Sequence, residues 1–312
     1  MTATALPPYG ALTDAALGWL HAHRSRFALD EAVLEPDVDA GWTWKPLGEL
    51  AQICGCVQHH GDPRSRAHRL AAELLRFAWD QVGGGELLLR FHRSDPFATY
   101  PLELYAAFAW SGLRHTGYER FAARVTDNRN WTVLEQLPTR RMGVLNSARH
   151  AGLPPRGAPR ASLDGTWLGG LPEPWAFEVT AGYALTHTVF HLTDWGRTPT
   201  AVPADVADYL VMWLPAWLDS CVQQRQWDLC CELLVVAASL PEPLPPSLTE
   251  QAWSALAEAR DDTTGALVEC GPAPVDEPED QIFRGCYHST LLLAFASAIA
   301  GGNLRRPDRM SP

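Results

Sequence analysis

Lysine is almost absent from this sequence, and positive charge is scarce overall. Lys45 is the single lysine among 25 basic residues, and the formal net charge is -11. Binding to nucleic acid or to an anionic membrane needs a basic field that releases counterions or attracts lipid headgroups. The acidic balance therefore argues against both of these partners. It favours a small molecule, a peptide or another protein.

Long apolar runs and a basic leader are also missing. No apolar stretch reaches the length of about 20 residues that a membrane-spanning helix needs. The first residues, MTATALPPYGALTD, lack a basic segment followed by an apolar core. The seven cysteines are an odd number, and several lie in apolar helical stretches, which suits a reducing compartment better than a disulfide framework. We therefore expect a cytoplasmic protein.

Strand patterns are nearly absent, whereas apolar residues recur at spacings of three and four along most of the chain. The predicted helices are Leu12–Arg24, Pro46–His59, Ser65–Val82, Tyr100–Ser111, Tyr118–Asn128, Trp175–Thr193, Ala204–Gln224, Trp227–Leu240, Leu248–Arg260 and Gln281–Ala300. They come in pairs of roughly forty residues, the scale of helical repeats. We predict a single all-α domain over residues 1–300 whose paired helices close into an α/α toroid with a central cavity. An open solenoid is the alternative.

Two segments depart from this periodicity. Residues 137–174 are rich in Gly, Pro and Arg, which predicts an irregular loop. This loop is either a lid over the helix that follows it or a solvated excursion. Residues 301–312, GGNLRRPDRMSP, predict a disordered tail.

Several well-known motifs are missing. No G-x-S-x-G elbow joins a strand to a helix, which argues against a serine hydrolase of that class. The glycines at 83–85 have neither the following lysine nor the preceding strand of a phosphate-binding loop. The cluster Cys54, Cys56, His59 and His60 has a C-x-C spacing that does not match zinc fingers.

The segment THTVFHLTDWG, Thr186–Gly196, carries the most informative polar pattern. On a helix, His187, His191 and Asp194 project from one stripe, because they lie at i, i+4 and i+7. Their apolar neighbours indicate that this stripe is turned toward the protein, where polar groups need a partner, a ligand or a function. Metal binding, acid–base or substrate contact, and structural hydrogen bonding all remain open. In the second case, Asp194 orients a histidine that acts as a general base.

A second pattern combines Asp228-Leu-Cys230 with Tyr287-His288 about sixty residues later. Carboxylate, thiolate and imidazole suit a catalytic zinc that keeps a fourth position open. The pattern, with the apolar helix YHSTLLLAFASAIA, resembles the zinc-ligand layout of protein prenyltransferase β subunits, which are α/α toroids. This resemblance, over about the last hundred residues, implies Asp228, Cys230 and His288 as zinc ligands.

The whole chain resembles an uncharacterised family of bacterial, mostly actinobacterial, helical proteins. The shared segments are Thr-His-x-x-Phe-x-x-Thr-Asp-x-Gly, here Thr186–Gly196, and Tyr-His-Ser/Thr, which begins here at Tyr287. The resemblance implies an α-helical domain of unknown function, often associated with specialised metabolism. It implies no reaction.

Two smaller clusters have structural explanations as well as functional ones. His92, Arg93 and Asp95 precede a helix start marked by proline, so they either cap that helix or face the cavity. His59 and His60 end a helix, where histidine is favourable against the helix dipole, and we expect a solvated terminus there.

These patterns together predict an enzyme that acts on a small molecule or a modified peptide in a central helical cavity, in specialised metabolism. The candidate catalytic residues are His187, His191, Asp194, Tyr287 and His288. No cofactor is identified, and zinc is the candidate. The alternative is a noncatalytic helical scaffold that binds a peptide or protein and uses the same polar residues to lock its helices. One sequence does not give the oligomeric state.

Overall fold

The computed structural model describes residues 9–30, 32–35, 39, 41–154, 156–272 and 277–305. Within these ranges no β-strand forms, and the one strand-like contact is an isolated bridge between Gln226 and Cys270. The predicted all-α class is confirmed. The α-helices are α1 (Tyr9–Ala22), α2 (Trp44–His60), α3 (Arg66–Gln81), α4 (Glu86–Ser94), α5 (Tyr100–Trp110), α6 (Thr116–Thr126), α7 (Pro138–His150), α8 (Val179–Leu192), α9 (Ala204–Gln224), α10 (Trp227–Ala238), α11 (Glu250–Ala259) and α12 (Glu279–Leu304).

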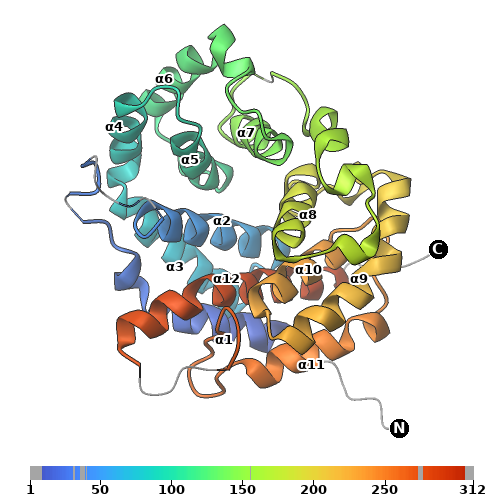
Figure 1. Ribbon diagram of the computed structural model, residues 1–312. Coiled ribbons are helices and arrows are strands. Elements are labelled where there is room, and N and C mark those ends of the chain that lie inside the picture. Colours follow the sequence, from blue (N-terminus) through green and yellow to red (C-terminus); the bar gives the residue numbers. More distant parts are fainter. Residues whose placement is uncertain are drawn as a thin grey trace.

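The helices pack in a circular order around a common centre (Figure 1). Successive contacts run from α2 to α5, α7, α8, α10 and α12, and α12 packs in turn against α2. Other helices pack outside these: α1 against α12, α3 against α2, α4 against α5, and α9 against α10. Residues of the inner helices therefore face one another across the centre although they are far apart in sequence.

Apolar composition places α10 and α12 deep in the fold. Nearly every residue of α10 is buried, including Asp228 and Glu232. Helix α12 is long and apolar enough to cross a membrane by composition alone, but 78% of its most apolar window is buried inside the fold. A helix that is apolar on all sides is typical of a protein core as well as of a membrane, and α12 is packed as a core helix here.

Two predictions about irregular segments are wrong in part. Within residues 137–174, α7 forms from Pro138 to His150 and becomes one of the inner helices. It starts with proline in its first turn, a favourable position, but its buried face combines Gly143 and Asn146 with Met142 and Val144, so apolar periodicity is weak. At the C-terminus α12 continues to Leu304, so residues 301–304 are helical. The rest of the predicted tail, residues 306–312, lies outside the described residues.

Candidate active site

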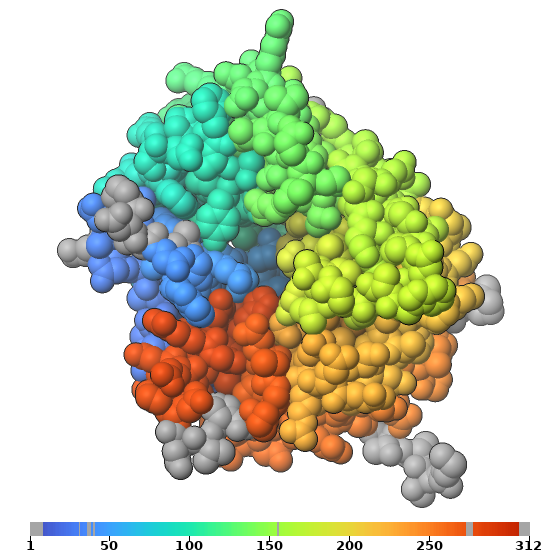
Figure 2. Space-filling model, viewed as in Figure 1, coloured from blue at the N-terminus to red at the C-terminus, as the bar shows by residue number. Residues whose placement is uncertain are grey.

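Two adjoining pockets lie where the inner helices face one another. Figure 2 shows the hollow near the centre of the molecule. We name them the His150 pocket, of about 350 Å³, and the His288 pocket, of about 540 Å³. They share Gly41, Lys45 and Glu49 as lining residues. The His150 pocket is also lined by Gln52, Tyr100, Glu103, Asn146, Ser147, His191 and Trp195, among others. The His288 pocket is also lined by Trp42, Tyr183, His187, Asp228, Glu232, Glu269, Arg284 and Tyr287.

Two imidazole–carboxylate pairs face the His288 pocket. His288 Nδ1 on α12 lies 3.2 Å from Glu49 Oε2 on α2. His187 Nε2 on α8 lies 3.7 Å from Glu232 Oε1 on α10. Each pair joins two different inner helices. Four helices thus contribute ionisable groups to one pocket.

The carboxylates raise the pKa of both histidines. Burial alone lowers the pKa of His288, but the charge and hydrogen bond of Glu49, together with the charge of Glu232, raise it from 6.5 to about 9. Burial also opposes the charged form of His187, and Glu232 more than offsets this, so its pKa is raised too. His288 is therefore an imidazolium at neutral pH. An imidazolium in a cavity is a proton donor.

Two polar contacts, one helical turn apart, join α8 to α10. Tyr183 donates a hydrogen bond to Asp228 Oδ2, and one turn further along both helices His187 faces Glu232. Glu232 also accepts a hydrogen bond from Thr186 Oγ1. Each helix places its two polar groups at i and i+4, on one face.

The pKa values of the two carboxyl groups on α10, Asp228 and Glu232, are shifted in opposite directions. Burial raises the pKa of Asp228, and its hydrogen bond from Tyr183 does not offset the effect. Burial also opposes ionisation of Glu232, but the neighbouring His187 lowers its pKa overall. The pKa of the Tyr287 hydroxyl is raised by burial and by nearby Glu49. Neighbouring groups with diverging pKa values are typical of acid–base sites.

Asp194 does not lie on the α8 stripe, which corrects the helical register predicted for it. α8 ends at Leu192, and Asp194, Trp195 and Gly196 follow in the left-handed region with φ of 54°, 56° and 81°. Thr193 stabilises this turn, because its hydroxyl donates to Val189 O and accepts from the Gly196 amide. The turn redirects the Asp194 side chain away from His187 and His191.

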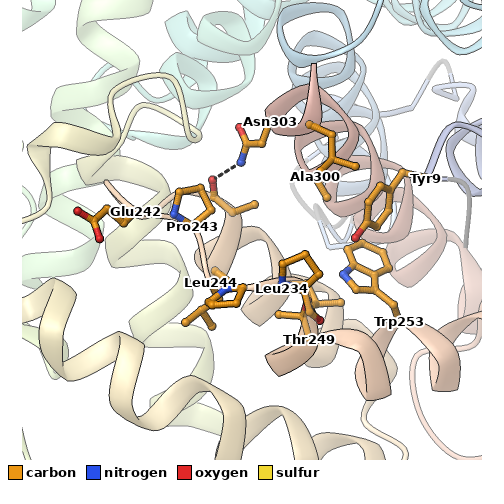
Figure 3. A pocket seen from close by; sticks show the side chains of 14 residues that line it. Tyr9, Leu234, Glu242, Pro243, Leu244, Thr249, Trp253, Ala300 and Asn303 are labelled. Carbon is orange, nitrogen blue, oxygen red and sulfur yellow. Dashed lines mark hydrogen bonds between the residues drawn. The ribbon is translucent and has the colours of Figure 1, made fainter. Parts of the chain in front are cut away.

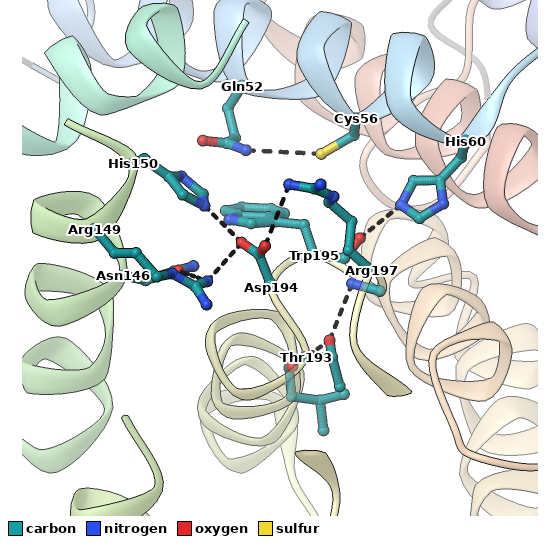
Figure 4. Close-up of polar contacts among 12 residues, drawn as sticks. Gln52, Cys56, His60, Asn146, Arg149, His150, Thr193, Asp194, Trp195 and Arg197 are labelled. Atoms are coloured by element: carbon teal, nitrogen blue, oxygen red, sulfur yellow. Dashed lines mark hydrogen bonds and ion pairs between the residues drawn. The ribbon is translucent and has the colours of Figure 1, made fainter. Parts of the chain in front are cut away.

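The Asp194 carboxylate instead joins a polar cluster at the C-terminal end of α7 (Figure 4). His150 Nε2 lies 2.5 Å from Asp194 Oδ1. Arg149 and Arg197 lie 2.8 Å and 3.5 Å from its two oxygens. Although burial raises the pKa of Asp194, the hydrogen bond from His150 and the adjacent positive charges lower it overall. Asp194 is an ionised carboxylate that orients a histidine, as one sequence hypothesis stated, but that histidine is His150.

His191 lines the His150 pocket and makes no ion pair among the described residues. Its ring packs against Gly143 of α7, where an added Cβ would lie only 2.9 Å from Nε2. Its Nδ1 is buried and makes no hydrogen bond in the described structure. Burial and the charge of His187 lower the pKa of His191 to about 3. His191 is therefore a neutral imidazole, in contrast to His187 one turn before it.

The zinc ligands implied by the prenyltransferase resemblance do not come together. Two residues apart on a helix, Asp228 and Cys230 point in nearly opposite directions. Cys230 is fully buried, and burial raises the pKa of its thiol well above the usual value, whereas metals bind the thiolate. Among the described residues, no group of three His, Cys, Asp or Glu side chains is placed to hold a metal ion. Asp228 and His288 do line one pocket.

No residue of the two smaller histidine clusters lines a central pocket. His92 is fully buried in α4, its Nδ1 lies 2.9 Å from the Tyr118 hydroxyl, and burial lowers its pKa to about 4. The predicted solvated terminus at His60 is wrong, because His60 is only 9% exposed and its Nε2 lies 2.7 Å from Trp195 O. His60 thus holds the left-handed turn against α2.

A third pocket, of about 370 Å³, shares no lining residue with the two central ones. Figure 3 shows Tyr9 and Trp253 on one side and Pro243 and Leu244 on the other. The Asn303 side chain, on α12, donates a hydrogen bond of 2.8 Å to Ala238 O. None of the catalytic candidates lines this largely apolar pocket.

Residues 13–298 match a protein family described as "Domain of unknown function (DUF6895)". The chain belongs to the DUF6895 family. Membership agrees with the resemblance to an uncharacterised helical family. No curated protein and no solved structure matches the chain. DUF6895 itself supplies no reaction, so a function for this member has to be argued from its pockets.

Proposed function

We propose that this protein is an enzyme that performs acid–base chemistry on a small molecule or a modified peptide bound in the two central pockets. The observation that carries the proposal is the His288 pocket, where His288, His187, Asp228 and Glu232 come from three inner helices and have pKa values moved in different directions. An ion pair that only locks helices together accounts for His187 with Glu232, but not for Asp228, whose raised pKa beside them supplies a second proton-transfer group.

We infer further that the inner helices form an α/α toroid. The circular order of contacts supports this, and so does the direction of neighbouring helices. Tyr183 and His187 on α8 meet Asp228 and Glu232 on α10 in the same order along both chains. When helical hairpins close into a ring, the inner helix of each hairpin runs in the same direction. Parallel neighbours are therefore expected of a toroid.

The same direction holds between α7 and α8. Near the start of α7, Thr139 Oγ1 lies 3.2 Å from Thr188 Oγ1. Further along α7, Gly143 packs against His191. At the end of α7, His150 contacts Asp194, which lies beyond the end of α8. Three inner helices in succession are thus parallel, which supports closure of the ring around a substrate cavity.

We place the reaction in the cytoplasm and in specialised metabolism. All seven cysteines are free thiols, and six of them are buried, which suits a reducing compartment. Zinc stays a prediction, and no step of the proposed chemistry is routed through it, since Cys230 faces the core. In the proposed chemistry the imidazolium of His288 is the acid, and the neighbouring carboxylates keep it charged.

Turnover by wild-type protein and by His288→Asn tests the proposal. The protein, at one-thousandth of the metabolite concentration, is incubated with small molecules and short peptides extracted from the source cells, and the extract is followed by mass spectrometry. We expect wild type to consume at least one compound over many turnovers. His288→Asn should lose about 10²- to 10⁴-fold of that rate, the usual contribution of a general acid.

His21→Asn is the matched control, because His21 lies on the outer helix α1 and pairs with Glu73. It should turn over at the wild-type rate, and both variants should be fully folded at the assay temperature, which circular dichroism checks. The contrary outcome is that no compound is depleted by more than one equivalent of protein and that the depletion is equal in all three proteins. That outcome would identify a noncatalytic binding scaffold.

A further inference from the structure

The His150–Asp194 pair is a second imidazole–carboxylate arrangement, and it lies outside the His288 pocket. We propose that His150, oriented by Asp194, is a general base that takes a proton from a hydroxyl, a thiol or a water bound in the His150 pocket. The inference deepens the proposed function, because it names the group that loses a proton, an O–H or S–H of the substrate or of a bound water, and places that group at one pocket. It rests on the proposed function only for the identity of the pocket as a reaction site.

The pair is close and enclosed. His150 Nε2 lies 2.5 Å from Asp194 Oδ1, and the two side chains are 6% and 9% exposed. Arg149 and Arg197 flank the carboxylate and keep it ionised, so Asp194 accepts the hydrogen bond and His150 Nε2 donates it. A buried carboxylate in this position fixes one imidazole tautomer and stabilises the imidazolium that forms when the ring takes a proton.

The other ring nitrogen of His150 is available. Its Nδ1 makes no hydrogen bond within the described residues, and His150 lines the pocket. The ring is also held in place, because it stacks on Trp110 with the centroids 4.9 Å apart and the planes 9° from parallel. The guanidinium carbon of Arg197 lies over the Trp110 ring, 5.7 Å from its centroid. A fixed ring that lines a cavity and has one nitrogen without a hydrogen-bond partner is what a general base requires.

The backbone around Asp194 is strained in a way that serves this arrangement. Asp194 and Trp195 are two consecutive non-glycine residues with φ of 54° and 56°. Such residues persist only where the surroundings hold them, and they concentrate at functional sites. Here the left-handed turn brings Asp194 to His150 and places Trp195 in the lining of the same pocket.

The chemical step is a single proton transfer. The Nδ1 lone pair of His150 forms a new N–H bond with the proton of the substrate O–H or S–H. The electron pair of the broken bond stays on the oxygen or sulfur, which becomes the nucleophile. The Nε2–H bond stays intact and donates to Asp194, so no oxidant, reductant or co-reactant is needed.

Carbethoxylation with diethyl pyrocarbonate tests this inference without a known substrate, because the reagent modifies unprotonated imidazole nitrogens. The rate for each histidine is measured by peptide mapping on the folded, full-length protein at neutral pH. We expect His150 to react despite its burial, and its rate to fall at least about tenfold in Asp194→Asn, where the wrong tautomer is favoured. His21, on the outer helix α1, should react at the same rate in both proteins.

An unreactive His150 in wild type, or an equal rate in folded Asp194→Asn, would overturn the inference. If Asp194→Asn does not fold, the nitrogen-15 NMR shifts of His150 in wild type decide the question. An Nε2–H tautomer with an unprotonated Nδ1 supports the base, and an Nδ1–H tautomer contradicts it. An inert His150 together with turnover that depends on His288 would refute this inference alone, whereas a reactive His150 without turnover would refute the proposed function alone.

Discussion

Asp194→Ala is expected to lower the free energy of unfolding by about 1.5–3 kcal/mol, the usual loss when a buried hydrogen bond to a charged group is removed. The substitution removes the acceptor of the His150 hydrogen bond and the counter-charge of Arg149 and Arg197 at the end of α7. It also puts alanine at φ of 54°, where a carboxylate is no longer present to hold the left-handed turn. Urea denaturation at pH 7 measures the change.

Asp219→Ala is the matched control for this prediction. Asp219 is an exposed residue of α9 for which no ion pair occurs among the described residues, and exposed substitutions of this kind usually stay within about 0.5 kcal/mol. If Asp194→Ala cost less than about 1 kcal/mol, the carboxylate would not be what holds α7 to the turn after α8. The orientation of His150 would then need another cause.

The stability of the protein is expected to fall by about 3 kcal/mol between pH 6.5 and pH 9 because of His288. Its pKa is about 9 in the folded protein against 6.5 for a free histidine, and each pKa unit corresponds to about 1.4 kcal/mol. A raised pKa means that the folded state holds the proton more tightly. The stabilisation is therefore complete below pH 6.5 and is lost as the pH rises through about 9.

The comparison of wild type with His288→Asn isolates this contribution from other titrating groups. The difference in unfolding free energy between the two proteins should be largest at pH 6 and should shrink by about 3 kcal/mol at pH 9.5. His21→Asn should show no such trend. A difference between wild type and His288→Asn that does not change with pH would mean that Glu49 does not hold His288 in its charged form.

Local patterns predicted much of the helical framework and part of the candidate site. The spacing of His187 and His191 in an apolar run correctly places both on α8, and both line the central pockets. The same periodicity misplaced Asp194, because Thr193 and Gly196 end the helix with a left-handed turn. A threonine three residues before a glycine was the local signal for that ending.

A single sequence did not predict which residues contact the site residues. Glu49 is separated from His288 by 239 positions, and only the packing of α2 against α12 brings them together. Glu232 carries a weaker local signal, since it follows Asp228 by four residues on one face of an apolar helix. The interpretation of Asp228 and Cys230 as a ligand pair weighed the residue types and overlooked that i and i+2 lie on opposite faces.

His150 was missed for a different reason. It lies within residues 137–174, whose arginines, glycines and prolines indicated a loop, although α7 forms there and ends at His150. The buried face of α7 meets polar and small groups, such as His191 against Gly143, so apolar periodicity fails to mark it. Functional helices that line a cavity are expected to show this weakness, because their inner face contacts a ligand and not a core.

The most direct test of the central claim, that one helical cavity holds histidines tuned in opposite directions, is an NMR pH titration. The protein is labelled with nitrogen-15 histidine, and the signals are assigned with His187→Asn, His191→Asn and His288→Asn. We expect His288 to titrate near pH 9 and His187 above 6.5, and His191 to stay neutral down to about pH 3 or until the protein unfolds. Titration of all three histidines together near pH 6.5 would contradict the claim.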